Sequence, residues 1–320
     1  MADAPLSLVA DIGGTNTRVA LASGPRLLPA TIRRFRNADH PALAPVLRAF
    51  LSDAGSPRIE GACVAAAGPV RDGVATLTNL DWTVDGDQLR DATGAARVAV
   101  LNDLQAQGHA LGHIDAANLR VLLPGPDRAP TGPRLVVGVG TGFNAAPVHD
   151  TATGRLVAAS ECGHAGMPVR TERDLRLARF VETAHGFAGV EDVLSGRGLE
   201  RLHAFACAET GIAESRTAAG IMAAIAEPGP AQEAARLFAC LLGAETGNLA
   251  LIHLPFGGIY LCGGVARAFA PHLLPLGFAE AFRDKGRFSA FMADFPVAVV
   301  EDDYAALTGC ATCLAAGAIG

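Results

Sequence analysis

The chain has 320 residues, of which half are hydrophobic and 18% are charged, and it contains 37 glycines. A chain of this length usually forms two domains, and the composition is typical of a well-packed α/β enzyme rather than of a disordered or fibrous protein. The formal net charge of −6 excludes an electrostatic footprint for nucleic acid or for an anionic membrane. We therefore expect neither of them as a partner.

The sequence favours a soluble cytoplasmic protein. The N-terminus has an early acid, Asp3, and no basic region, which does not match a signal peptide. The most apolar late stretch, 249–265, is interrupted by a proline and four glycines and is too broken to span a bilayer. The seven cysteines are odd in number and stand in apolar surroundings, which indicates reduced thiols. Cys310 and Cys313 lack a second ligand pair nearby, so we interpret them as thiols of an alanine-rich terminal helix.

The segment 6–21 is the first candidate ligand site. An apolar run ends at Asp11, a turn follows, and a second apolar run leaves it, which predicts a strand, a tight turn and a strand. The turn consists of Gly13, Gly14, Thr15 and Asn16. Because glycine lacks a Cβ, the turn can adopt unusual backbone angles and bring its N–H groups against a phosphate. Asp11 would repel that phosphate unless a divalent cation lay between them, which suggests a magnesium nucleotide. The alternative for this segment alone is an ordinary hairpin with a surface acid.

The lysine content limits how a nucleotide can be held. Lys285 is the only lysine, and no Gly-x-x-x-x-Gly precedes it. This excludes a P-loop, and it argues against the strand lysine of a protein kinase. If the protein binds ATP, it does so through another architecture.

The rest of the first hundred residues predicts a compact α/β unit. The predicted elements are strands at 30–35, 62–67 and 74–77, an amphipathic helix at 41–54 ended by Gly55, and a helix capped by Asp85 that runs through Arg90.

Two polar residues, Asn102 and Asp103, follow a buried strand at 98–101 and precede a helix that starts near Leu104. Ligands of open α/β sheets bind at the carboxyl ends of strands, and a carboxylate at such a place can act as a general base. The alternative is that Asp103 caps the helix. We interpret the glycines of the segment 108–112 as the passage into a second domain.

A second glycine-rich turn repeats the pattern of the first. After a proline-rich loop at 124–133, a strand at 135–139 runs into a turn and then into a strand at 145–149. The turn contains Gly140, Thr141 and Gly142. Two such units, one in each expected domain, suggest a duplicated fold that holds phosphates from both sides.

Further polar candidates follow this turn. Glu161 and His164 would share a face within one helical turn, and in a loop they could still converge on a ligand that forms hydrogen bonds. Metal binding is the competing interpretation, but this pair with one cysteine falls below the usual ligand count for zinc. Glu191 precedes the helix start at Ser195 and, taken alone, is interpreted as a solvated acid.

The last part of the chain predicts a long helix at 231–252, a strand at 257–262, a helix that begins near Val265, a strand at 296–300 and a helix at 304–316. Gly263 and Gly264 separate the second strand–helix pair and leave room for a flat ring or a ribose against the backbone.

These motifs together resemble a known superfamily. The turns at 11–16, 138–142 and 262–265 resemble the phosphate-1, phosphate-2 and adenosine motifs of the sugar kinase, Hsp70 and actin superfamily. Within it, the segments 101–104, 161–164, 191–196 and 284–288 are similar to the Escherichia-type family of bacterial glucokinases. The resemblance covers nearly the whole chain in order.

The resemblance implies an α/β fold of two ribonuclease-H-like (actin-like ATPase) domains with a ligand cleft between them. The implied limits are 1–111 with 302–320 for a small domain and 112–301 for a large one. The implied activity is ATP-dependent phosphorylation of glucose to glucose 6-phosphate, with ATP and Mg²⁺, and a homodimer is the implied assembly. No structural zinc is expected, because the chain lacks the Cys-x-Cys-Gly-x-x-Gly-Cys motif of the related ROK sugar kinases.

The resemblance also implies residue roles. Asn102 and Asp103 would bind sugar hydroxyls, and Asp103 would take the proton of the attacking 6-hydroxyl. The remaining hydroxyls would be bound by Glu161, His164 and Glu191. The nucleotide would be held by Gly13, Gly14, Thr15, Asn16, Gly140, Thr141, Gly142, Gly263 and Gly264, with Asp11 serving Mg²⁺ directly or through water.

The second turn departs from the family pattern. The family usually has Gly-Thr-Gly-Leu-Gly, whereas this chain has Phe143 and Asn144 at the last two positions. Asparagine tolerates a left-handed backbone, so we expect the turn to be kept, with an effect on nucleotide affinity or donor choice. The alternatives to a glucokinase are a kinase for mannose, fructose or an amino sugar, and a regulatory ATPase without kinase activity.

Overall fold

The computed structural model describes residues 5–77, 80–126 and 132–317. Contacts divide the chain into two compact units, each built from segments that are distant in sequence. Unit 1 contains Met1–Asn118, Val148–Ala158 and Asp302–Gly320, and unit 2 contains Leu119–Pro147 and Ala159–Glu301. Relative to the limits implied above, this division assigns the segments 112–118 and 148–158 to the first unit.

Unit 1 is built on a mixed sheet in the order β3-β2-β1-β5-β9, with β4 paired to β2. Its strands are β1 (Leu6–Ile12), β2 (Asn16–Ser23), β3 (Arg26–Leu27), β4 (Arg33–Arg36), β5 (Gly61–Ala66) and β9 (Arg97–Asn102). The β1–β2 pair is antiparallel, and β5 pairs in parallel with β1 and β9. Every residue of β5 is buried, as expected for a parallel strand that is covered on both faces.

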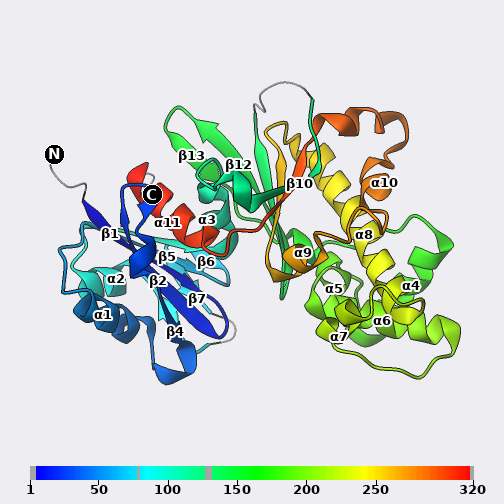
Figure 1. The fold of residues 1–320 in the computed structure, drawn as a ribbon, viewed down its shortest axis with the longest axis horizontal. Coiled ribbons are helices and arrows are strands. Elements are labelled where there is room, and N and C mark those ends of the chain that lie inside the picture. Colours follow the sequence, from blue (N-terminus) through cyan, green and yellow to red (C-terminus); the bar gives the residue numbers. More distant parts are fainter. Residues whose placement is uncertain (1–4, 78–79, 127–131, 318–320) are drawn as a thin grey trace. The chain divides into compact units, whose positions relative to one another are not determined.

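Helices cover both faces of this sheet (Figure 1). The helices of the unit are α1 (Leu43–Asp53), α2 (Gly86–Thr93), α3 (Asp103–Ala110) and α11 (Ala305–Ala315). Leu8 and Ala10 of β1 lie in one apolar cluster with residues of α1 and α2. Val9, between them, lies in a second cluster with residues of α11, because successive side chains of a strand point to opposite faces.

Smaller elements complete unit 1. They are a separate sheet of β6 (Val70–Arg71), β7 (Val74–Thr76) and β8 (Thr83–Val84), and 3₁₀ turns at Pro29–Thr31, Asn37–Asp39 and Ala116–Asn118. Asp85 caps α2 as predicted, because its side chain accepts a hydrogen bond from Gln88 N at 2.8 Å. The predicted strand at 30–35 is partly wrong. Its first half is a 3₁₀ turn, in which the Thr31 hydroxyl donates to Leu28 O at 2.6 Å.

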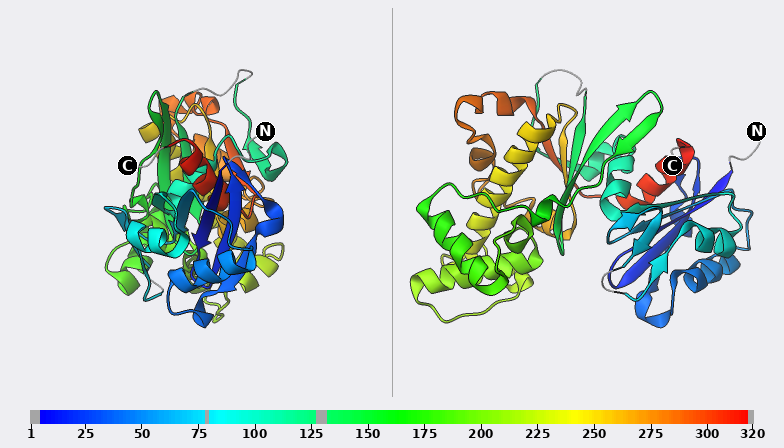
Figure 2. Two further views of the ribbon diagram at one scale, coloured as in Figure 1. Left: turned by 90° about the vertical axis from the view of Figure 1, so that its left-hand side faces the viewer. Right: turned by 180° about the vertical axis from the view of Figure 1, so that it is seen from behind.

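The C-terminal helix α11 packs closely on α3 and on β1 and β5 (Figures 1 and 2). A Cβ added to Gly309 would lie 1.7 Å from the carbonyl oxygen of Ala106 in α3. Any other residue at 309 would force the two helices apart. The packing of α11 thus fixes the position of α3, the helix that begins at Asp103.

The opposite side of α3 packs on β13 (Gly154–Val157). A Cβ at Gly108 would lie 2.6 Å from Val157 Cγ1, and Gln105 Nε2 donates to Val157 O at 3.2 Å. Our interpretation of the glycines from 108 as a passage into a second domain is therefore wrong for Gly108. This glycine lies inside α3, where it allows the close approach of the strand.

The second large sheet has the order β10-β15-β14-β11-β12-β13, and most of its residues belong to unit 2. Its further strands are β10 (Leu119–Leu123), β11 (Arg134–Val139), β12 (Phe143–Thr151), β14 (Ile259–Cys262) and β15 (Val297–Val300). The central strand β14 pairs in parallel with β11 and with β15. The predicted strands at 135–139, 145–149, 257–262 and 296–300 are confirmed with small shifts of their ends.

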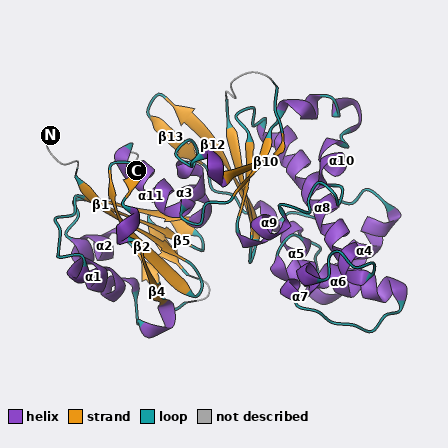
Figure 3. Ribbon diagram, in the orientation of Figure 1, coloured by secondary structure: helices purple, strands orange, loops and turns teal. Residues whose placement is uncertain are grey.

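Most helices of unit 2 gather on one side of this sheet (Figure 3). They are α4 (Glu172–His185), α5 (Val190–Val193), α6 (Gly196–Thr210), α7 (Ala218–Ala223), α8 (Pro230–His253), α9 (Gly264–Phe269) and α10 (Phe278–Arg283). Short 3₁₀ turns lie at Cys162–His164, Gly286–Phe288 and Phe291–Asp294. The ring of Phe238 in α8 stacks on that of Phe269 in α9 with centroids 4.4 Å apart, so the long helix forms part of the core.

Within the described residues, α8 is long and apolar enough to cross a bilayer by length and composition alone. However, 67% of its most apolar window is buried inside the protein. A buried core helix explains this composition without a membrane.

His109 in α3 is a buried ionisable group with an altered pKa. It is 6% exposed, and its Nδ1 has no hydrogen-bond partner within the described part of the chain. The guanidinium group of Arg155 in β13 lies close by and donates to the carbonyl oxygen of His109 at 3.0 Å. Burial, with the charge of Arg155 as a second cause, lowers the pKa of His109 from 6.5 to about 4. Protonation of this imidazole therefore opposes folding.

We expect an acid-dependent loss of stability from this group. The unfolded chain takes up the proton as the pH falls below 6.5, but the folded chain does so only near pH 4. The contribution of His109 to the free energy of unfolding is therefore complete above pH 6.5 and falls by up to about 3 kcal/mol as the pH decreases to 4. Urea unfolding at pH 7 and pH 5 should show a smaller acid loss for His109→Gln than for the wild type. An equal loss in both proteins would contradict this assignment.

Candidate functional site

The first glycine turn joins β1 to β2 as predicted. Gly13 N donates to Asn16 O at 3.0 Å, which closes the turn, and Gly14 and Thr15 are exposed. Neither Gly13 nor Gly14 has a positive φ, so the expected unusual backbone angles are absent at these two residues. The exposed turn residues nevertheless leave the backbone accessible to a ligand.

Asn37 braces this turn, a role that the sequence pattern did not reveal. Its Nδ2 donates to Gly13 O at 2.7 Å, and its backbone N donates to Thr15 O at 2.9 Å. Its Oδ1 accepts from Thr17 Oγ1 at 2.8 Å, and both Asn37 and Thr17 are buried. Asn37 lies 24 residues after Gly13, beyond the reach of any local motif. Asn37 thus holds the turn and the start of β2 at three points, two of them through its side chain and one through its backbone.

Asp11 lies opposite Arg18 in the β1–β2 register. Arg18 Nη1 lies 3.3 Å from Asp11 Oδ2, and the Asp11 side chain is 17% exposed. Burial raises the pKa of the Asp11 carboxyl, and the charge and hydrogen bond of Arg18 oppose this rise. The sequence did not reveal this partner, which stands on the neighbouring strand seven residues away.

Asn102 and Asp103 take different positions at the start of α3. Asn102 is the N-cap: its Oδ1 accepts from Gln105 N at 2.6 Å, and its own N–H donates to Gln105 Oε1 at 3.1 Å. The alternative that Asp103 caps the helix is therefore wrong. Asp103 is exposed at the first helical position, with its Oδ1 accepting from Leu104 N at 2.8 Å.

The second glycine turn joins β11 to β12 and contacts the start of α6. Gly140 N donates to Gly142 O at 2.9 Å, while Gly196 N donates to Gly140 O at 3.0 Å. Ser195 caps α6, since its hydroxyl accepts from Gly198 N at 3.0 Å. The 15-residue helix therefore presents its positive end at the turn, beside the exposed Thr141. We did not predict this contact, which joins residues more than fifty positions apart.

The glycine at the end of β14 lies against the end of β11. Gly263 has a φ of 101°, and a Cβ there would lie 2.4 Å from Val139 O. Glycine is thus required at this position for two independent reasons. The pair Gly263-Gly264 and the second glycine turn therefore share the carboxyl edge of parallel strands.

The structure brings Glu161, His164 and Glu191 onto neighbouring segments of unit 2. Glu161 and His164 bound a 3₁₀ turn, with His164 N donating to Glu161 O at 3.1 Å. Val190 N donates to Ala165 O at 2.9 Å, which ties the segment of Glu191 to this turn. Glu161 and His164 are exposed. Glu191 is half-buried, and its Oε2 accepts from Phe143 N at 2.9 Å, so it is not a solvated surface acid.

Asn144 does not use the left-handed backbone that asparagine tolerates. It lies in β12, and the described non-glycine residues with a positive φ are Ser56, Asp72 and Leu254. β12 begins at Phe143, directly after Gly142, so Asn144 already lies within the strand. The side chain of Asn144 instead bonds to the segment that carries Glu161.

A second titratable cluster lies elsewhere in unit 2. One ligand atom from each of His203, Cys207 and Glu214 lies within 4.8 Å of the others. Arg216 Nε, however, lies 2.5 Å from Glu214 Oε1, and His203 Nε2 lies 3.5 Å from Glu214 Oε2. The guanidinium group already supplies a positive charge to this carboxylate, so the network is explained without a metal ion.

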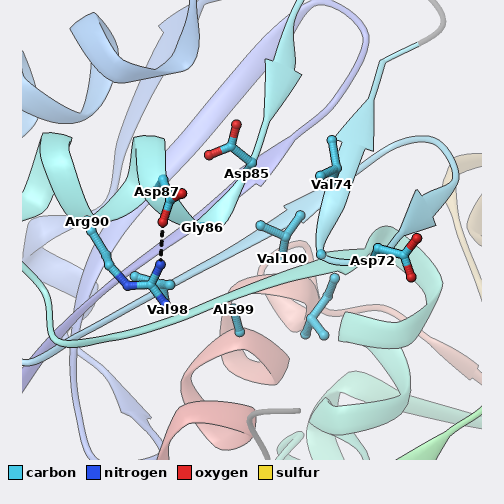
Figure 4. Close-up of a pocket in the computed structure, with 11 residues that line it drawn as sticks. Asp72, Val74, Asp85, Gly86, Asp87, Arg90, Val98, Ala99 and Val100 are labelled. Atoms are coloured by element: carbon cyan, nitrogen blue, oxygen red, sulfur yellow. Dashed lines mark hydrogen bonds and ion pairs between the residues drawn. The ribbon is translucent and has the colours of Figure 1, made fainter.

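The lining of a surface pocket of unit 1 contains none of the predicted site residues (Figure 4). The pocket is lined by Asp72–Val74, Asp85–Asp87, Arg90 and Val98–Leu101. Asp85 caps α2 and Asp87 pairs with Arg90 at 2.7 Å, so these three charged groups serve the helix.

Comparisons with known proteins agree with this arrangement. A model of the glucokinase family matches residues 8–317. A glucokinase of Chromobacterium violaceum is 33% identical over 314 residues, which cover 96% of this chain and 89% of that protein. The crystal structure of a glucokinase from an Antarctic psychrotroph superposes with a TM-score of 0.86 at 32% identity, covering 98% of this chain and 99% of that one. A ROK family glucokinase from Streptomyces griseus, in complex with glucose and AMPPNP, has a TM-score of 0.62 at 20% identity over 96% and 98% of the two chains, which shows the fold alone.

The two α/β units, each with a strand–glycine turn–strand, and these neighbours define a protein of the actin-like ATPase fold that sugar kinases use. The predicted fold class is therefore confirmed. The chain belongs to the glucokinase family. The resemblance drawn from the sequence motifs is confirmed as well.

We expect Asn37→Ala to loosen the first glycine turn. The change leaves a buried hydroxyl and the Gly13 carbonyl without their partner, which costs about 1–3 kcal/mol of unfolding free energy. Urea unfolding measures this loss, and amide hydrogen exchange at Gly13 should become faster. Asn37→Asp keeps the acceptor for Thr17 but removes the donor to Gly13. Comparing it with Asn37→Ala therefore shows how much each of the two side-chain hydrogen bonds contributes. Wild-type stability and exchange in Asn37→Ala would contradict the bracing role.

Proposed function

We propose that this chain transfers the γ-phosphoryl group of ATP to the 6-hydroxyl of glucose and forms glucose 6-phosphate. The observation that carries the proposal is the exposed Asp103 carboxylate at the carboxyl end of β9, in a chain that matches the glucokinase family model over residues 8–317.

Asp103 is the proposed general base. Its carboxylate accepts the proton of the 6-hydroxyl while that oxygen forms a bond to the γ-phosphorus and the bond from phosphorus to ADP breaks. Asn102 binds a hydroxyl of the same sugar. Because its Oδ1 caps α3, its amide N–H groups are the part that we assign to glucose.

Residues of unit 2 bind the other hydroxyls of glucose in this proposal. Glu161 and Glu191 accept hydrogen bonds from hydroxyls, and His164 either donates or accepts. A sugar with a misplaced hydroxyl leaves such a polar group unpaired, and this penalty supplies selectivity among hexoses.

The two glycine turns hold the nucleotide. Gly13, Gly14, Thr15 and Asn16 bind phosphate from one unit, and Gly140, Thr141 and Gly142 bind it from the other. The positive end of α6 adds a favourable field beside Gly140, so no lysine is needed. Gly263 and Gly264 leave space for the adenosine.

Mg²⁺ neutralises charge on the phosphates of ATP when it is bound with them. The carboxylate of Asp11 suits this hard cation, because Mg²⁺ prefers oxygen ligands and keeps several waters. Since Arg18 lies 3.3 Å from one Asp11 oxygen, we assign Asp11 to contact through water rather than to direct ligation.

We further propose a cytoplasmic enzyme whose partners are glucose and ATP, assembled as a homodimer. The net charge of −6 gives no basic surface for a nucleic acid or an anionic membrane, which is compatible with small-molecule partners.

A panel of hexoses with Mg-ATP tests the function. The expected result is ADP release matched by sugar phosphate, with the highest kcat/KM for glucose among glucose, mannose, fructose and glucosamine. A higher kcat/KM for another hexose would reassign the substrate. ATP hydrolysis without phosphorylation of any hexose would favour a regulatory ATPase and overturn the proposal.

Asp103→Asn should lower kcat by about a thousandfold with glucose, because a general base contributes about 10²- to 10⁴-fold. The KM for ATP should change little. Asp87→Asn is the matched control, since Asp87 is also an aspartate in the first turn of a helix and its side chain is 91% exposed. Steady-state kinetics measure both variants. Full activity of Asp103→Asn would remove Asp103 from the role of base.

A further inference from the structure

The side chain of Asn144 connects the second glycine turn to the segment that carries Glu161. Its Oδ1 accepts from Ala145 N at 2.8 Å and from Cys162 N at 3.2 Å. Ser160 Oγ lies 3.0 Å from the same oxygen and donates to Ala145 O at 2.6 Å. Its Nδ2 donates to the carbonyl oxygen of Ser160 and, at 3.4 Å, to Glu161 Oε2. The oxygen of the amide faces donors and its nitrogen faces acceptors, which fixes the orientation of the side chain. Asn144 thus forms hydrogen bonds with the backbone on both sides of Glu161 and with the carboxylate of Glu161.

Close packing strengthens this connection. A Cβ at Gly163 would lie 2.0 Å from Phe143 O, and a Cβ at Gly142 would lie 2.4 Å from Glu191 Oε2. With the bond from Phe143 N to Glu191 Oε2, the start of β12 contacts the segments of both acidic residues. Neither segment can shift without disturbing the turn.

We propose that Asn144 is a positioning residue that sets the affinity of this chain for glucose by holding Glu161. This inference rests on the proposed function, in which Glu161 binds a sugar hydroxyl. A free glutamate side chain loses much rotational entropy when it binds a ligand, and an exposed one such as Glu161 must be ordered in advance to bind well. The amide of Asn144 supplies this order.

The effect is specific to the sugar. The hydrogen bonds from Gly140 N to Gly142 O and from Gly196 N to Gly140 O do not involve the Asn144 side chain. Loss of that side chain should therefore weaken the binding of glucose more than that of ATP.

Asn144→Asp is the sharpest test, because it keeps the size and the Oδ1 acceptor but replaces the donor by a negative oxygen that faces Glu161. Loss of a hydrogen bond to a charged group corresponds to about a ten- to hundredfold rise in the KM for glucose. We expect kcat and the KM for ATP to stay close to the wild-type values. Asn144→Ala removes the donor without the repulsion and should give a smaller rise.

Ile221→Val is the control for a general loss of stability. It removes one methyl group from a fully buried side chain of α7, and it should lower Tm without changing either KM. A wild-type KM for glucose in Asn144→Asp would overturn the proposal. Equal increases in the KM for glucose and for ATP would overturn it as well, because they would indicate general damage to the turn.

Hydrogen exchange separates this proposal from the proposed function. Backbone amides of the segment 160–164 should exchange faster in Asn144→Asp than in the wild type, and this readout needs no activity. If the wild type phosphorylates no hexose, the proposed function fails, and faster exchange still supports the positioning role. Unchanged exchange of this segment would overturn that role whatever the activity.

Discussion

The close approach of α11 to α3 is the constraint on which unit 1 depends. At Gly309 the two helices come so near that a Cβ would overlap the carbonyl oxygen of Ala106, and on its other side α3 meets Val157 at Gly108. Glycine at both contacts lets α3 fit between two neighbours, since packed interiors do not absorb even one extra methyl group without strain. Asp103, at the first position of α3, owes its place to a residue near the C-terminus and to one in the middle of the chain.

Both units share a second feature. In each, the side chain of an asparagine outside the glycine turn forms hydrogen bonds that fix the turn or the segment next to it. Asn37 binds the first turn through Gly13 O, and Asn144 binds the segment after the second turn through Ser160 and Cys162. A carboxamide suits this task because it donates and accepts at the same time. The glycines leave the backbone open to a ligand, and the asparagines supply the rigidity that the glycines lack.

Local patterns predicted much of the fold. The buried strands, the long helix α8, the cap at Asp85 and the order of the glycine turns follow from periodicity and from residue preferences, which act over a few neighbouring positions. The errors arose where a distant partner, or a neighbouring residue with the same preference, decided the outcome. Gly108 was assigned to a domain passage because its contact with Val157 lies 49 residues away, and Asp103 was considered as a cap because its neighbour Asn102 is equally suited to that role.

The sequence by itself determined the family, the fold class and the set of polar residues that the family motifs carry, because these depend on residue types in a fixed order along the chain. Tertiary structure alone decided how those residues are held. Several interactions join segments that only folding brings together. They are the ion pair of Asp11 with Arg18, the hydrogen bond from Phe143 N to Glu191, and the side-chain hydrogen bonds of Asn37 and Asn144. The direction and distance of a hydrogen bond depend on the packing of whole elements, which no local pattern specifies.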